Sequence, residues 1–153
     1  MQFRFNKILL TLLLCGVLGA SYAQGRYSIS EYASLQSAIA SLGTAKATLN
    51  IDVPTAGYTG TIGDNFTLEF TNIGKITLGM GDALTVNAAI WAAPHQAIFD
   101  ASCCGVIVIS ANKSVPEWWL EWWGATGNGT TDDTAAIQAA FTAISHGQTL
   151  RML

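Results

Sequence analysis

The chain has 153 residues, a formal net charge of −3 and only 11% charged residues. No stretch is rich in lysine or arginine, which argues against nucleic acid as a partner. The length is that of one ordinary domain.

The first 23 residues have the pattern of a secretory signal peptide. Arg4 and Lys7 give a positive start, an uncharged apolar run follows, and Ser21 and Ala23 supply the small residues of a cleavage site. The apolar run is shorter than the ~20 residues of a bilayer span. We expect cleavage after Ala23, export to the periplasm or the extracellular space, and no membrane attachment afterwards. The mature chain then has five basic residues against ten acidic ones.

The first mature element, residues 28–43, has the pattern of an amphipathic helix. Ser28 and Glu31 stand in capping-box register, and Gly43 supplies a stop. Four apolar residues share one helical face: Tyr32, Leu35, Ile39 and Leu42. Such a helix must cover an apolar surface, which the next segment provides.

Short apolar segments cut by turn residues fill the chain from residue 47 to 110. Their alternating or β-branched character predicts strands at 47–53, 65–70, 75–79, 83–92, 96–100 and 105–110. The segment 54–64 is expected to be a connection. Leu68, Ile76 and Leu84 look like equivalent inward positions of three short turns of one motif. The spacing suits sandwiches, barrels and solenoids alike.

Cys103 and Cys104 are the cysteines of the mature chain. Two small apolar residues in a turn are the favoured interpretation, because sequence neighbours close a strained disulfide ring. A bridge between them, or one to a partner chain, stays open for an exported protein. A metal site would need more ligands nearby.

Four tryptophans follow within six residues: Trp118, Trp119, Trp122 and Trp123. Flat aromatic rings are stacking platforms for sugars, and they are equally suited to seal a junction between two parts of a fold. For Trp122 and Trp123 we favour the seal. Trp118 and Trp119 are the candidate carbohydrate-binding residues.

Two neighbouring aspartates, Asp132 and Asp133, precede an alanine-rich segment of helical periodicity. Its predicted apolar face consists of Ile137, Ala140, Phe141 and Ile144. Thr131 or Asp132 is the expected N-cap, and Asp133 lies in the first turn, where the helix dipole favours negative charge. Adjacent residues do not converge across a cleft as a catalytic pair does, and calcium would need further oxygen ligands. Both aspartates are therefore expected to be structural.

Residues 121–144 resemble the opening motif of secreted right-handed parallel β-helix proteins of the pectate-lyase superfamily, which includes pectate lyases, polygalacturonases and rhamnogalacturonase-like proteins. That motif runs roughly Glu-Trp-Phe-Gly-Ala, Gly-Asp-Gly, then Thr-Asp-Asp-Thr-x-Ala-Ile-Gln-x-Ala. The matching positions are Glu121, Trp122, Gly124, Ala125, Gly127, Gly129, Thr131, Asp132, Asp133, Thr134, Ala136, Ile137, Gln138 and Ala140. Trp123 replaces the usual Phe. The likeness extends backward over residues 67–100.

The resemblance implies a mainly β fold: an N-terminal β-rich cap region plus the start of a right-handed parallel β-helix, with two short α-helices. The expected boundaries are a signal peptide at 1–23, the helix and cap region at 24–116, and an incomplete β-helix domain at 117–153. Because a solenoid needs about three repeats to bury its apolar faces, we expect the chain to be a truncated piece of a longer protein.

The function implied is that of the N-terminal part of a secreted protein acting on polysaccharide. At full length it would be a glycoside hydrolase or a polysaccharide lyase for uronate-containing polymers. The alternative is a non-catalytic carbohydrate-binding or adhesin-like surface protein on the same scaffold. His95 and His146 are expected to be structural, since neither has a triad partner nearby in the sequence.

This chain alone is expected to be inactive and to hold no cofactor. Calcium would belong to downstream coils if the full-length protein is a lyase. Polysaccharide is the expected partner, and homo-oligomerisation of the full-length protein is left open.

Overall fold

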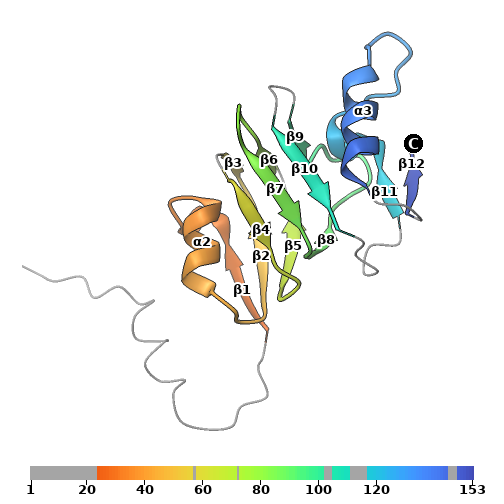
Figure 1. The fold of residues 1–153 in the computed structure, drawn as a ribbon. Helices are drawn as coiled ribbons and strands as arrows, with labels where there is room; N and C mark the ends of the chain where they lie inside the picture. Colours follow the sequence, from red (N-terminus) through yellow and green to blue (C-terminus); the bar gives the residue numbers. More distant parts are fainter. Residues whose placement is uncertain (1–23, 57, 72, 102–104, 111–116, 145–147) are drawn as a thin grey trace, which may run out of the picture.

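The computed structural model describes most of the chain after the predicted signal peptide (Figure 1). The described residues are 24–56, 58–71, 73–101, 105–110, 117–144 and 148–153. The predicted signal peptide, the Cys103–Cys104 pair and His146 lie outside them. Among these residues, no helix is long and apolar enough to cross a membrane.

The fold is mainly β, and every strand pair in the described residues is parallel. A four-stranded sheet has the order β1-β2-β5-β8. Its strands are Gly25–Ser28, Ala47–Ile51, Phe66–Phe70 and Ala89–Trp91. Two three-stranded sheets have the orders β3-β6-β9 and β10-β7-β4. Their strands are Pro54–Ala56, Lys75–Thr77 and Phe99–Asp100, and Val106–Ile109, Ala83–Val86 and Gly60–Ile62.

The chain visits these three sheets in the same order on successive passes: β2, β3, β4, then β5, β6, β7, then β8, β9, β10. Side chains on neighbouring passes meet at a nearly constant interval. Asn50 bonds Ser28, and Gln96 bonds the Gly74 carbonyl, each across 22 residues. We call residues 25–109 the three-sheet region.

The interior is built from the alternate side chains that each strand turns inward. Leu68, Ile76 and Leu84 are each at most 1% exposed, which confirms them as inward positions, one in each sheet. Leu49 and Leu68 face each other in register, so aliphatic side chains stack from strand to strand. Burying each of them contributes roughly 1.5–3 kcal/mol.

Residues 54–64 contain two strands, β3 and β4, where the sequence predicted a connection. Each has only three residues, and Pro54 and Gly60 disguise them. Both strands lie at the edge of their sheets, and parallel neighbours hold them there. An edge is where proline is tolerated in a sheet, and ladder hydrogen bonds outweigh the weak local preference.

The first helix is shorter than predicted and begins later. A 3-10 turn, η1 (Ile29–Glu31), precedes α2 (Leu35–Leu42), and Tyr32 lies outside the helix. The predicted Ser28–Glu31 capping box is wrong. The capping box that forms joins Ser34 and Ser37, because Ser37 N donates to Ser34 Oγ and Ser34 N donates to Ser37 Oγ. Gly43 ends the helix, as predicted.

The two ends of the three-sheet region carry different covers. At the N-terminal end α2 lies beside β1 (Figure 1) and buries Leu35 and Ala38. Toward the C-terminus, residues 117–153 form β11 (Glu117–Trp119), η2 (Leu120–Trp123), α3 (Thr134–Ala143) and β12 (Thr149–Arg151). Here η2 contacts β9, and α3 contacts β10. We call residues 117–153 the C-terminal segment.

The buried face of α3 differs from the predicted one. Ala140 and Ala143 are buried, but Phe141 is 65% exposed and Ile144 is half-buried. Small alanine side chains let the helix pack closely on η2, and this contact rotates the bulkier Phe141 outward.

Candidate functional site

The predicted sugar-binding residues lie in or against the core. Trp118 is 0% exposed and packs edge-on against Trp122, with ring centroids 5.6 Å apart, so neither ring face is open to solvent. Trp119 is half-buried and packs against the same core. The assignment of these two residues to sugar binding stays a prediction, and the present packing leaves only Trp119 partly accessible.

The tryptophans that were expected to seal a junction are buried. Trp122 and Trp123 are 3% and 7% exposed, and Trp123 lies 5.5 Å from Phe99 of β9. The indole Nε1 of Trp122 donates to the Ala93 carbonyl at 3.0 Å. The backbone N–H of Ile98 donates to the Trp122 carbonyl. These contacts join the C-terminal segment to the three-sheet region.

The neighbouring aspartates have separate structural tasks. Asp132 Oδ1 accepts from the Thr134 N–H at 3.0 Å, at the start of α3. Asp133 occupies the N-cap position without a side-chain cap bond, and its carboxylate instead accepts from the N–H groups of Thr126 and Gly127 at 2.9 and 2.8 Å. The structural interpretation holds, but Asp133 fastens the preceding loop, which the sequence did not predict.

These hydrogen bonds lower the pKa of both carboxyl groups. The Thr134 hydroxyl and then its N–H lower the pKa of Asp132. The Thr126 and Gly127 N–H groups are the main cause of the lowered pKa of Asp133. A proton donor for glycoside cleavage needs a raised pKa instead. Neither aspartate therefore has the properties of a general acid at neutral pH.

A hollow of about 470 Å³ lies between α3 and β10. It is lined by Asp100, Asp132 and Asp133 together with Trp123 and several alanines. Its carboxylates are engaged, since Asp100 pairs with the Lys75 Nζ at 3.2 Å and the two aspartates bond the backbone. Within the described residues no group of three or more His, Cys, Asp or Glu side chains is placed to hold a metal ion.

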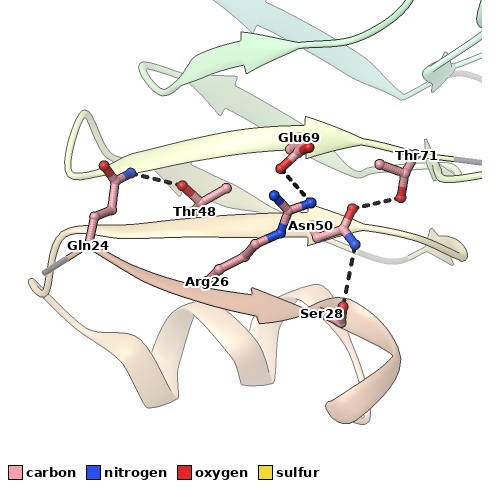
Figure 2. A network of polar contacts seen from close by, with 7 residues as sticks. All are labelled: Gln24, Arg26, Ser28, Thr48, Asn50, Glu69 and Thr71. Atoms are coloured by element: carbon pink, nitrogen blue, oxygen red, sulfur yellow. Dashed lines mark hydrogen bonds and ion pairs between the residues drawn. The ribbon is translucent and has the colours of Figure 1, made fainter.

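The outward face of the four-stranded sheet gathers polar side chains from all four strands. We call it the polar face; Figure 2 shows most of it. Its residues are Gln24, Arg26, Ser28, Thr48, Asn50, Thr67, Glu69, Thr71 and Trp91. Because successive strand residues point to opposite sides, the same alternation that builds the core builds this face.

Two rows of side chains cross the polar face from strand to strand. One row begins with Arg26, Thr48 and Thr67 in parallel register. The other contains Ser28, Asn50, Glu69 and Trp91, again in register. Neighbouring strands in a sheet lie about 4.8 Å apart, so hydrogen-bonding groups recur at that interval along each row.

Internal hydrogen bonds and one ion pair hold the polar face in place (Figure 2). The Asn50 amide donates to Ser28 Oγ at 3.4 Å and accepts from Thr71 Oγ1 at 2.7 Å. Arg26 Nη2 lies 2.9 Å from Glu69 Oε2. The groups are therefore preorganised, which reduces the ordering cost of binding a ligand.

Trp91 ends the second row and is 65% exposed. Its register partner on β5 is Glu69, so an open indole lies beside a carboxylate that can accept hydrogen bonds. The sequence analysis passed over this residue in favour of the tryptophan cluster. The available signal was the alternation around Ile90, which is buried and so turns Trp91 outward.

No protein-family model, curated protein or solved structure matches this chain. The function must therefore be argued from the chain's own geometry and from the sequence resemblance described above.

Proposed function

We propose that the chain is the N-terminal part of a secreted right-handed parallel β-helix protein that acts on polysaccharide, and that this part holds the polymer rather than cleaving it. Parallel pairing and the repeated visiting order of three sheets support the β-helix, as does the motif at residues 121–144. The signal-peptide pattern supports export. Whether downstream coils are catalytic or adhesin-like is a separate question about the full-length protein.

The observation that carries the binding role is the exposed ring of Trp91 in register with Glu69, at the end of a row of hydrogen-bonding side chains. Sugars present apolar C–H faces that stack on aromatic rings and hydroxyl groups that bond carboxylates and amides. Trp91 supplies the first kind of contact, and Glu69 and Asn50 supply the second.

The row geometry fits a linear polymer lying across the strands. Strands spaced about 4.8 Å apart repeat the polar groups at close to the length of one pyranose unit. A chain lying along the row would meet Trp91, then Glu69, then Asn50. We therefore expect binding to strengthen from a monosaccharide to a short oligosaccharide.

Cleavage by this part is not supported by its carboxylates. Hydrolysis needs two carboxyl groups facing each other across the scissile bond. On the polar face Glu69 is paired with Arg26, and near α3 the aspartates bond backbone N–H groups. We propose that binding, not chemistry, is the contribution of this part.

The test is retention of the exported chain in affinity gels that contain different polysaccharides. Trp91→Ala should abolish retention while leaving the melting temperature nearly unchanged, because the ring is exposed. Ile73→Ala is the matched control, since Ile73 is also a large exposed apolar residue at 70% exposure. Trp119→Ala tests the site predicted from the sequence. Retention that is lost with Trp119→Ala and kept with Trp91→Ala would move the site to the tryptophan cluster.

A further inference from the structure

We infer that the polar face selects neutral polysaccharides and discriminates against polyuronates. The inference rests on the proposed function and names its ligand class. The argument is one of charge, and it starts from the basic side chains that an anionic polymer would need.

Three of the four basic residues in the described part of the chain are already paired. Arg26 lies 2.9 Å from Glu69, Lys75 lies 3.2 Å from Asp100, and Arg151 pairs with Glu117. The fourth, Lys46, precedes β2 and is exposed. A polyuronate carries a negative charge on every sugar, and holding it requires several free cations at matching intervals. The polar face does not offer them.

The charges on the polar face cancel each other. Its one cation, Arg26, and its one anion, Glu69, bond directly, and the rest of the face is neutral hydroxyl, amide and indole. Hydroxyl and amide groups bond uncharged sugars without the desolvation cost of a free charge. This composition matches a neutral polymer.

Glu69 also stands where a uronate would be repelled. It neighbours Trp91 in register, so a sugar stacked on the indole places its substituents close to the Glu69 carboxylate. The side chain of Glu69 is 21% exposed, and that of Arg26 is 60% exposed. A competing uronate would have to displace Glu69 from Arg26, leaving a partly buried carboxylate without its cation.

The charge of the whole mature chain acts in the same direction. Its ten acidic residues outnumber its five basic ones, so the mean field repels an anionic polymer. Salt screens this field over about 10 Å at moderate ionic strength. Weak polyuronate binding should therefore rise with salt, whereas binding through free cations would fall.

The experiment compares the exported chain on a neutral β-glucan, on a neutral xylan and on polygalacturonate, at low and high salt, with EDTA present to remove bridging calcium. We expect Trp91-dependent retention by at least one neutral polymer, and at least about tenfold weaker retention by polygalacturonate, the equivalent of one pKa unit of charge interaction. The wild-type chain alone decides selectivity, so no variant has to fold for this result.

Glu69→Gln sharpens the test, because it removes the repelling carboxylate and frees Arg26. Polygalacturonate retention should rise about tenfold and become weaker with added salt. Glu117→Gln is the matched control, since it breaks an ion pair outside the polar face and should change neither polymer.

The outcomes separate the two proposals. Retention by no polysaccharide, or retention that ignores Trp91→Ala, overturns the proposed function. Trp91-dependent retention that is as strong on polygalacturonate as on neutral glycans overturns only the ligand class.

Discussion

The three-sheet region and the C-terminal segment are held together in different ways. In the first, parallel ladders run through sheets of three or four strands, and the interior is shared by many aliphatic side chains. In the second, β11 pairs only with β12 among the described residues, and packing concentrates on a few indole rings. Single large side chains should therefore matter most in the C-terminal segment, and backbone fit should matter most in the three-sheet region.

Trp118→Ala should produce the largest loss. The ring is fully buried against Trp122 and Trp123, and deleting such an aromatic side chain costs about 3–5 kcal/mol. Denaturant unfolding followed by circular dichroism measures the loss. Trp119→Ala removes a half-buried indole from the next position and should cost clearly less. Equal losses would show that packing is not concentrated in the buried rings.

Gly74→Ala should be the most damaging small change in the three-sheet region. A Cβ at Gly74 would lie 1.6 Å from the Ile51 carbonyl oxygen, so neighbouring backbones would have to separate. Overpacking of this kind costs about 3 kcal/mol or more when backbone must move. Gly79→Ala is the control, because its nearest contact would be Asp82 Oδ2 at 3.6 Å. A melting temperature for Gly74→Ala close to that of Gly79→Ala would contradict the close-approach argument.

Asp133→Ala should lower the melting temperature more than Asp132→Ala. Asp133 accepts from two N–H groups and from the Thr126 hydroxyl, whereas the backbone bond to Asp132 comes from Thr134 alone. Asp132→Asn should be nearly neutral, because an amide oxygen can still accept that bond. Differential scanning fluorimetry on the three variants gives the ranking. The reverse order would return the main structural role to Asp132.

The sequence predicted which residues turn inward better than it predicted where elements begin. Leu68, Ile76 and Leu84 follow from alternation, which any buried strand obeys. β3 and β4 were missed because Pro54 and Gly60 are poor strand formers, and only their parallel neighbours hold them extended. Local pattern does not show such pairing partners, which lie more than 20 residues away.

The candidate site was harder to predict than the core. Four clustered tryptophans drew attention by number, yet burial removes most of their surface. Trp91 stands alone in the sequence, and its importance depends on Glu69 of the neighbouring strand. The Arg26–Glu69 pair likewise joins strands that are distant in sequence. A row that crosses strands is a property of register, and register is not written in any one segment.

Acid should loosen both regions, through a different aspartate in each. In the three-sheet region the Ser30 hydroxyl, at 2.6 Å, is the main cause of the lowered pKa of Asp52. In the C-terminal segment the N–H groups of Thr126 and Gly127 lower that of Asp133. A carboxyl group with a lowered folded-state pKa stabilises the fold above its ordinary value of 3.8, and this stabilisation is lost as the pH falls through the lowered value. Both groups are exposed, so solvent keeps each effect small.

Tryptophan fluorescence can separate the two contributions. In a Trp91→Phe background the remaining tryptophans of the mature chain, at 118, 119, 122 and 123, all report on the C-terminal segment. Melting temperatures from that signal should fall as the pH drops below about 4, the range in which an ordinary Asp takes up its proton. In Asp133→Asn the neutral-pH melting temperature should be lower and the acid-induced fall shallower, because asparagine cannot titrate. Asp52→Asn is the matched control, because its carboxyl lies in the other region. If Asp52→Asn flattens this signal and Asp133→Asn leaves it steep, the loop before α3 is not the acid-sensitive contact of the C-terminal segment.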